Sequence, residues 1–312
     1  MAIPDFPHIL VIRTGAIGDT IAMSVVYQAL RRYYPHAYIE ALGSAERLQL
    51  INMPPLINKI TSMDFSDFST LFMEDVQLPP HLIAYFQSFN VILCYSFDPK
   101  NIVTKNLCKI RAHQVSRFDP FPPKDANIHI TTYLLRTLEV LGIYAEQLFP
   151  EIAIPELEHH VSHSPELRIA IHPGSGSPEK NWDATNFAEV GIRAARVYHA
   201  KILLIAGPAE AESAQIITNK LSQNSLILLQ NLPLSAVAGE LRKCQLYVGN
   251  DSGISHLAAA VGVPTIAIFG PSNPHVWRPI GKQVVVLQGD SRPHCVGVSV
   301  EHVFTAITRI LG

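Results

Sequence analysis

The sequence predicts an α/β protein of two units, each a parallel sheet with helices on both faces. Short β-branched apolar runs alternate with amphipathic stretches along all 312 residues, and this βαβα order is typical of parallel sheets. The strand candidates are continuously apolar, as expected for strands buried on both faces. The rhythm breaks at 149–168, where three prolines and three histidines follow no periodic apolar face. We therefore expect an interdomain linker there, between domains 1–150 and 151–312 with a cleft between them.

The first half of the chain contains the elements of one such sheet. Its strand candidates are rich in Val, Ile, Leu and Tyr, while its helical stretches carry apolar residues every three or four positions. The strands are expected at 8–12, 38–42, 58–62, 90–94 and 113–117, and helices at 20–34 and 132–142.

The second half repeats the pattern of short apolar strand candidates separated by helical stretches. They are expected at 168–172, 201–206, 226–230, 246–249, 265–269 and 284–288, with helices in the gaps, including 183–197 and 301–311. This half alone therefore provides a second doubly covered sheet.

Composition narrows the class of protein. Hydrophobic residues make up 48%, charged residues 16%, and the formal net charge is −2, so the balance is that of an ordinary globular protein and favours no nucleic-acid partner. No apolar run is long enough for a signal peptide or a membrane span, which predicts a cytoplasmic protein, at most bound to a membrane surface. The scattered cysteines are expected to be free thiols without a metal site: Cys94, Cys108, Cys244 and Cys295.

The first strand-to-helix junction, RTGAIGD, opens a long helix whose free amides favour a nearby negative group. Gly15 and Gly18 supply only part of a dinucleotide fingerprint, although Glu40 ends the next strand where a ribose-binding acid would lie. The incomplete motif disfavours a nicotinamide site. Asp19 is either the N-cap of the helix or a carboxylate at the mouth of the cleft that accepts a proton.

The second junction, HPGSGSPEKNW, joins a strand to a helix through small polar residues and one cation. Ser175, Gly176 and Lys180 offer a hydroxyl, a flexible amide and a compact ammonium group, which together suit phosphate oxygens. The spacing of a P-loop is absent. The alternative is that Lys180 is an ordinary solvated loop lysine.

The third junction, AGPAEAE, places Glu210 and Glu212 just beyond the strand expected at 201–206. An acid at the carboxyl end of a strand can accept hydrogen bonds from sugar hydroxyls. Acids in the first turn of a helix also suit its dipole, so a purely structural role stays open.

The fourth junction, GNDSGISH, again ends a strand with small polar residues. Asn250 or Asp251 can cap the helix that follows, which leaves the amides of Ser252 and Gly253 for an anion. His256 lies one turn into that helix, where a packed or surface histidine is the ordinary interpretation. All four junctions fall at carboxyl ends of strands, where open α/β sheets bind ligands.

Together these junctions resemble glycosyltransferase family 9, the bacterial ADP-heptose:lipopolysaccharide heptosyltransferases. The similarity is carried by IRTGAIGDT, HPGSGSPEKNW, AGPAEAE and GNDSGISHLAAAVGVPTIAIFGPSNPHVW. The last segment resembles the family signature N-D-[TS]-G-x-x-H-L-A-A-A followed by F-G-P-[ST]. The N-terminal half matches mainly at 12–19 and in the helix near His129. Val25 stands where the family often has proline, and Asn181 where it usually has a basic residue.

The resemblance implies a GT-B fold with the acceptor in domain 1–150 and the nucleotide-sugar in domain 151–312. It also implies inverting transfer of heptose, or a related sugar, from an ADP-sugar without an obligatory metal or other cofactor. Asp19 matches the general base, Lys180 the lysine facing the diphosphate, and Glu210 the acid that holds the ribose, with Glu212 as the alternative. The implied donor-binding residues are Gly18, Ser175, Gly176, Lys180, Glu210, Asp251, Ser252, Gly253 and His256.

A basic stretch marks the expected acceptor side. Residues 100–117 contain five basic residues and no acid, and Lys105, Lys109 and Arg111 are candidates for binding an anionic glycolipid or oligosaccharide acceptor. Acidic lipid headgroups at the cytoplasmic face of the inner membrane are a further candidate partner, and a solvated helix face is the alternative. The apolar run at 79–89 is either a bilayer contact or, more simply, core.

Two further functions stay open for this sequence. A nucleotide-sugar 2-epimerase has the same two-domain layout but needs no acceptor, so the product distinguishes it from a transferase. A non-catalytic protein could retain the donor cradle alone, although Asp19 and Lys180 argue against it. A dehydrogenase is disfavoured by the incomplete glycine fingerprint.

Overall fold

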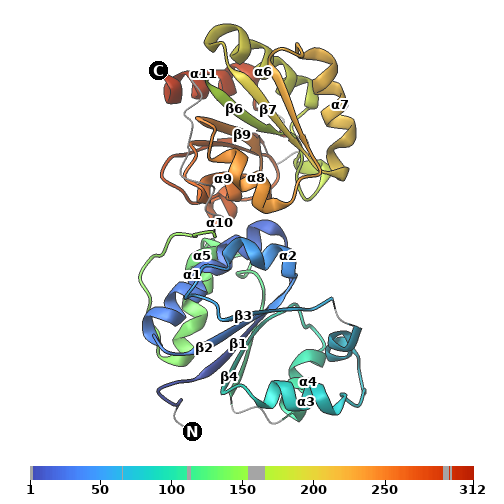
Figure 1. Cartoon of the computed structure of the whole chain (residues 1–312), viewed down its shortest axis with the longest axis vertical. Coiled ribbons are helices and arrows are strands. Elements are labelled where there is room, and N and C mark those ends of the chain that lie inside the picture. The colour runs from blue at the N-terminus through green and yellow to red at the C-terminus, as the bar shows by residue number, and fades with distance from the viewer. Residues whose placement is uncertain (1–2, 65, 111–113, 154–165, 291–294, 296) are drawn as a thin grey trace. The chain divides into compact units, whose positions relative to one another are not determined.

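Both predicted sheets are present in the computed structural model, and every strand pairs parallel to its neighbours (Figure 1). The structure describes residues 3–64, 66–110, 114–153, 166–290, 295 and 297–312. One sheet has the order β3-β2-β1-β4-β5, the other β11-β10-β9-β6-β7-β8. The prediction of an α/β protein with two parallel sheets is confirmed.

Each predicted strand is found with its ends within one residue of the expected positions. The first sheet contains β1 (His8–Arg13), β2 (Tyr38–Gly43), β3 (Lys59–Ser62), β4 (Val91–Tyr95) and β5 (Gln114–Phe118). The second contains β6 (Arg168–His172), β7 (Lys201–Ala206), β8 (Leu226–Gln230), β9 (Leu246–Asn250), β10 (Thr265–Phe269) and β11 (Val284–Gln288). The inner strands, such as β4, β9 and β10, are buried on both faces and give sharp apolar runs, which is why their ends could be located.

Helices connect the strands, and two of them differ from expectation. The first helix begins three residues earlier than predicted, so Asp19 lies inside its first turn. The helix expected at 132–142 is α5 followed by a 3₁₀ turn, which ends at Gly142 in the left-handed region (φ 72°). The helices are α1 (Ile17–Tyr33), α2 (Ala45–Leu48), α3 (Pro80–Gln87), α4 (Ile102–Lys109), α5 (Ile130–Arg136), α6 (Ala184–Tyr198), α7 (Ala211–Lys220), α8 (Leu234–Leu241), α9 (Gly253–Ala260), α10 (Pro274–Trp277) and α11 (Val300–Leu311).

The chain divides into two compact units. The first comprises Met1–Gly15 with Ala22–Leu148, and the second comprises Phe149–Gly312 together with the short segment Ala16–Ile21. The main division lies between Leu148 and Phe149, and the first turn of α1 groups with the C-terminal unit. Much of the predicted linker, 154–165, lies outside the described residues.

The core of the first unit uses the apolar run at 79–89. Leu82 and Phe86 of α3 are 4% and 0% exposed, and Phe89 just beyond it is 2% exposed. They pack with α4 against one face of the sheet. This run is therefore core, as the simpler interpretation predicted.

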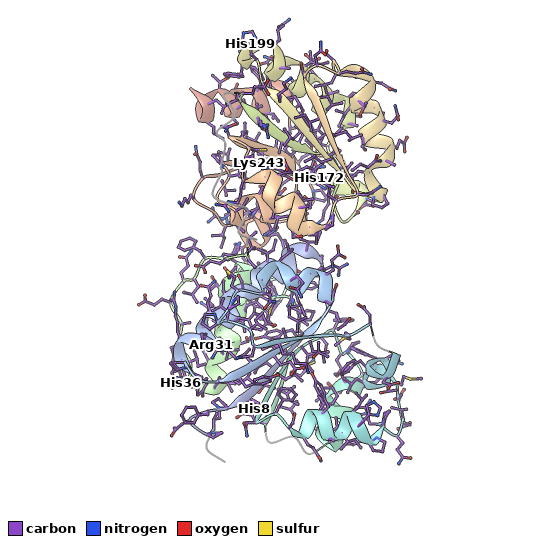
Figure 2. All side chains as sticks on the ribbon, viewed as in Figure 1. His8, Arg31, His36, His172, His199 and Lys243 are labelled. Atoms are coloured by element: carbon purple, nitrogen blue, oxygen red, sulfur yellow. The ribbon has the colours of Figure 1, made fainter. Side chains whose placement is uncertain are left out.

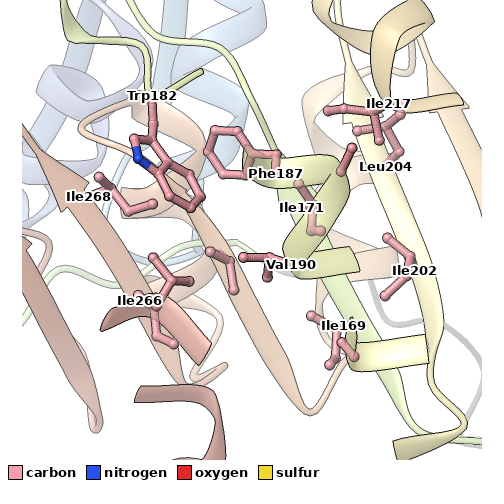
Figure 3. Close-up of a cluster of buried hydrophobic side chains, with 14 of the residues drawn as sticks. Ile169, Ile171, Trp182, Phe187, Val190, Ile202, Leu204, Ile217, Ile266 and Ile268 are labelled. Carbon is pink, nitrogen blue, oxygen red and sulfur yellow. The ribbon is translucent and has the colours of Figure 1, made fainter. Parts of the chain in front are cut away.

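One core cluster of the second unit lies between its sheet and three helices, α6, α7 and α11. Figure 3 shows Trp182 beside Phe187, with isoleucines of β6 and β10 around them. The two rings meet edge to face with centroids 5.0 Å apart, and the Trp182 indole donates a hydrogen bond to the Val298 carbonyl at 2.9 Å. Trp182 therefore fixes the end of the loop that follows β6 deep in this core.

The strand order of the second sheet indicates where a ligand site is expected. In the second sheet β6 lies beside β9, while β7 continues outward on the other side of β6. The chain therefore leaves β6 and β9 toward opposite sides. Open α/β sheets bind ligands in a crevice at the carboxyl ends of such a pair of strands. The loops that follow these two strands carry the second and fourth junctions of the sequence.

The helices of the described residues are too short, or too polar, for a membrane span.

Candidate active site

An ion pair joins the loops that follow β6 and β9. Lys180, at the end of the 3₁₀ turn Pro178–Lys180, donates from Nζ to Oδ2 of Asp251 at 2.7 Å. The Asp251 side chain is 8% exposed, whereas that of Lys180 is 35% exposed. Lys180 is thus not a solvated loop lysine, and its ammonium group is held at the crevice with one side open. A compact cation in this position suits phosphate oxygens.

Asn250 fixes the loop that carries Lys180. Its side chain is fully buried, Oδ1 accepts from the backbone N–H of Trp182 at 2.9 Å, and Nδ2 donates to the carbonyl of Pro173 at 2.7 Å. Both ends of the β6 loop are therefore tied to the last residue of β9. Sequence reasoning considered Asn250 only as a helix cap. The available signal was an amide inside a buried strand, because a buried polar side chain requires partners.

The helix α9 is capped differently from the prediction. Its N-cap is Ser252, whose Oγ accepts from the N–H of Ser255 at 3.4 Å, and the helix begins at Gly253. Asn250 and Asp251 are not the cap, because the first holds the β6 loop and the second pairs with Lys180. The first turn of α9 still follows directly after the end of β9, and the dipole of a helix favours an anion at its amino end.

Two glycines allow the first turns of α1 and α9 to approach each other within the second unit. A methyl group on Gly18 would lie 3.0 Å from Cδ2 of His256, and one on Gly253 would lie 2.6 Å from Cβ of Ile17. Neither position tolerates a side chain without movement. Gly18, Gly253 and His256, all predicted donor-binding residues, are thus brought together.

Asp19 lies in this same first turn of α1. Its Oδ2 accepts from the N–H of Ala16 at 2.9 Å, three residues earlier, so it is not the N-cap that one interpretation expected. The carboxylate satisfies a free amide at the start of the helix and is partly exposed.

The remaining predicted residues of the β6 loop have different surroundings. The Ser175 hydroxyl lies 2.6 Å from both the Ser177 carbonyl oxygen and Oδ1 of Asn181, while Gly176 is exposed. Asn181, which stands where the family usually has a basic residue, therefore helps to order the loop.

Glu210 and Glu212 are clearly distinguished by the structure. The Glu210 side chain turns back so that Oε2 accepts from the N–H of Gly207 at 2.8 Å. Glu212 is exposed in the first turn of α7. Only Glu210 is thus held at the carboxyl end of β7.

Cys295 is a contact that sequence reasoning missed. Its thiol donates to the carbonyl of Lys180 at 3.1 Å. Burial, with a smaller effect from the charge of Asp251, raises the pKa of Cys295 to about 11. The thiol therefore stays protonated at neutral pH and supports the backbone beneath Lys180.

Glu40 is excluded as a ribose ligand of a dinucleotide. It is 2% exposed, and its Oε1 accepts from the hydroxyl of Tyr85 at 2.7 Å and lies 3.2 Å from Nζ of Lys59. The carboxylate is committed to a buried network of the first sheet.

Two of the three expected acceptor residues lie on α4 of the first unit. Lys105 and Lys109 are exposed, while Arg111 lies outside the described residues. The nearest preceding acid, Asp98, is buried and accepts from the N–H of Ile102 at 2.7 Å. Burial alone would raise the pKa of Asp98, but hydrogen bonds from Thr104 and neighbouring amides lower it overall. The exposed charge of α4 is thus positive, and its acceptor role stays a prediction.

No cluster of three or more histidine, cysteine, aspartate or glutamate side chains suited to a metal occurs in the part of the chain that the structure describes.

The GT-B fold of glycosyltransferases consists of two parallel-sheet α/β units, and this chain has two such sheets. Residues 110–302 match the family described as Glycosyltransferase family 9 (heptosyltransferase). Because this match covers more than half of the chain, the protein belongs to that family and is a glycosyltransferase.

Individual relatives are similar to this protein over nearly the whole chain. The lipooligosaccharide heptosyltransferase 2 of Haemophilus ducreyi is 24% identical over 319 residues, which cover 90% of this chain and 88% of the relative. A family 9 glycosyltransferase structure from Veillonella parvula has a TM-score of 0.80 at 22% identity, covering 98% and 97%. The Escherichia coli ADP-heptose LPS heptosyltransferase II has 0.77 at 18% identity, covering 97% and 98%. The predicted GT-B fold is confirmed.

His172, labelled in Figure 2, is the last residue of β6. It is 6% exposed, and Nδ1 donates to the carbonyl of Ile205 at 2.9 Å. Burial lowers the pKa of His172, outweighing that hydrogen bond and the charge of Glu210, which both raise it. The folded protein therefore keeps this ring neutral.

The first prediction concerns Asn250. Asn250→Ala leaves the Trp182 N–H and the Pro173 carbonyl without their partner, which costs about 1–3 kcal/mol for each buried group. We expect lower stability in urea unfolding followed by far-UV circular dichroism. Asn250→Asp is the matched control. One oxygen of the aspartate still accepts from the Trp182 N–H, whereas the other oxygen faces the Pro173 carbonyl in place of the donor Nδ2. An unchanged urea midpoint in Asn250→Ala would contradict the role of Asn250 in holding the β6 loop.

The second prediction concerns pH. Unfolded His172 gains a proton below pH about 6.5, whereas the folded ring resists it, so the free energy of unfolding falls as the pH drops through that value. We expect His172→Asn, whose Nδ2 can replace Nδ1 as donor, to reduce this slope by up to about 1.4 kcal/mol per pH unit. Urea unfolding between pH 5.5 and 7.5 measures both slopes, and equal slopes refute the assignment.

Proposed function

We propose that the protein is an inverting transferase that moves heptose, or a related sugar, from an ADP-sugar to a lipopolysaccharide-core or other anionic glycan acceptor. The observation that carries the proposal is the Lys180–Asp251 ion pair (Nζ to Oδ2, 2.7 Å) beside the start of α9. This geometry occurs in a chain of the heptosyltransferase family. The names of the relatives, which specify ADP-heptose and lipooligosaccharide, support the kind of donor and acceptor.

The proposed donor site stabilises the leaving diphosphate. Negative charge grows on the β-phosphate as the glycosidic bond breaks, and donors aimed at that charge lower the barrier by about 3 kcal/mol each. Lys180 supplies a cation, while the amides of Ser252 and Gly253 supply hydrogen bonds and the positive end of the α9 dipole. Asp251 holds the ammonium group at the crevice before the phosphate binds, so little reorganisation is needed.

Asp19 is the proposed general base. Inversion requires an acceptor hydroxyl to attack the anomeric carbon from the side opposite the leaving group, with one base to remove its proton. The first turn of α1 groups with the donor unit, and Gly18 of that turn lies against His256. The carboxylate next to Gly18 is therefore near the predicted donor residues.

The acceptor belongs to domain 1–150 in this proposal, and the donor to 151–312. Lys105 and Lys109 are exposed on α4 and, with Arg111, would attract the phosphate or carboxylate groups of a glycolipid core. The same charges suit the anionic cytoplasmic face of the inner membrane, where such an acceptor is presented.

The third prediction tests the donor. We expect calorimetry to show ADP binding in preference to UDP, GDP and NAD, and Lys180→Ala to weaken ADP about 10- to 100-fold, as for a lost hydrogen bond to a charged group. Lys282→Ala removes an exposed lysine at the amino end of β11, opposite the site edge, and is expected to bind ADP normally. Preference for UDP would favour an epimerase, and no nucleotide binding would refute the donor site.

The fourth prediction separates the proposed role of Asp19 as a base from its hydrogen bond to the N–H of Ala16. Asp19→Asn keeps an oxygen that can accept from Ala16 but cannot take a proton, so kcat should fall about 10²- to 10⁴-fold while ADP affinity stays within about threefold. A radiolabelled-sugar transfer assay with a lipopolysaccharide-core acceptor measures kcat. Retention of wild-type kcat would remove Asp19 from the mechanism, and absence of any transfer by wild type would favour the non-catalytic alternative.

A further inference from the structure

The carboxylate of Glu210 lies over Gly174, a residue that none of the sequence arguments singled out. A methyl group built on Gly174 would overlap Oε1 and Cγ of Glu210 and lie 2.5 Å from its Cδ, and these are its three nearest atoms. The Gly174 backbone is outside the left-handed region. Glycine is therefore needed here for space and not for conformation.

The surroundings hold this carboxylate in one place. Oε2 accepts from the N–H of Gly207 at 2.8 Å, which ties it to the loop after β7. Gly174 belongs to the loop after β6, where Asn250 holds the preceding carbonyl. Since β6 and β7 are neighbours, one carboxylate spans two adjacent strand ends.

One oxygen of Glu210 remains available to a ligand. Among the described residues, no hydrogen bond is made to Oε1, while Oε2 is used by Gly207. The side chain is only partly buried. A fixed carboxylate at the carboxyl end of a parallel strand is well suited to accept from a sugar hydroxyl.

We propose that Gly174 is a positioning residue that seats Glu210 to accept a hydrogen bond from a ribose hydroxyl of a nucleoside diphosphate. This inference rests on the proposed function, because that function supplies the nucleotide. It also selects Glu210 over Glu212, which is exposed on α7. Any side chain at Gly174 displaces the carboxylate and removes the discrimination between ribose and deoxyribose.

The test compares the Kd values of ADP, 2′-deoxy-ADP and 3′-deoxy-ADP by calorimetry on the full chain. Wild type should bind ADP about 10- to 100-fold more tightly than the analogue that lacks the contacted hydroxyl, as expected for a hydrogen bond to a charged group. In Gly174→Ala and in Glu210→Gln this ratio should fall to within about threefold. Glu212→Gln should retain the full ratio.

Two controls separate positioning from damage to the fold. Gly176→Ala makes the same substitution in the same loop, where a methyl group meets nothing within 4 Å, and it should keep the ratio whatever its overall affinity. In a Glu210→Ala background, Gly174→Ala should not change the ratio further, because no carboxylate remains to displace. Equal thermal midpoints of Gly174→Ala and Gly176→Ala exclude unfolding as the cause.

The outcomes are distinct. A full ratio in Gly174→Ala, or loss of the ratio in Glu212→Gln instead of Glu210→Gln, overturns the inference. Wild type that binds ADP but does not discriminate against either deoxy analogue overturns it also, yet leaves the donor site intact. Wild type that binds no ADP refutes the proposed function itself.

Discussion

The site depends on the buried side chain of Asn250. Its amide is fully enclosed, and its two hydrogen bonds join the end of β9 to the beginning and the end of the β6 loop. A buried amide is stable only when both of its ends are paired, so the loop and the end of the strand stabilise each other. Every group proposed to bind the diphosphate lies next to this connection. Lys180 lies in the β6 loop, and Ser252 follows the end of β9.

The ion pair with Asp251 explains how a cation can be ready at the crevice without a ligand. A lysine carries much side-chain entropy, and a pair with a nearly buried carboxylate limits that freedom before phosphate arrives. The pair itself adds little stability, because attraction and desolvation nearly cancel when charges are buried. Its value lies in orientation. Cys295 supports the same residue from the backbone side.

The sequence predicted the strands, the sheet class and most of the site-bearing junctions, because these follow from local apolar runs and small polar residues. It could not predict which polar residue of GNDSG caps the helix, which one pairs with Lys180 and which one holds the β6 loop. Asn250, Asp251 and Ser252 are all good caps locally, and the choice is made by Trp182, Pro173 and Lys180, which come from elsewhere in the chain. Tertiary partners, and not propensity, decide such competitions.

The glycines of the motifs show the same principle. Loops rich in glycine are usually interpreted as flexible, yet Gly18, Gly253 and Gly174 do not have positive φ angles. At each of them a methyl group would meet another segment: the ring of His256, the side chain of Ile17 and the carboxylate of Glu210, respectively. These glycines therefore lie where parts of the chain distant in sequence approach each other closely. Gly176, which faces open space, has no such constraint, so glycines that look equivalent in the sequence have different physical roles.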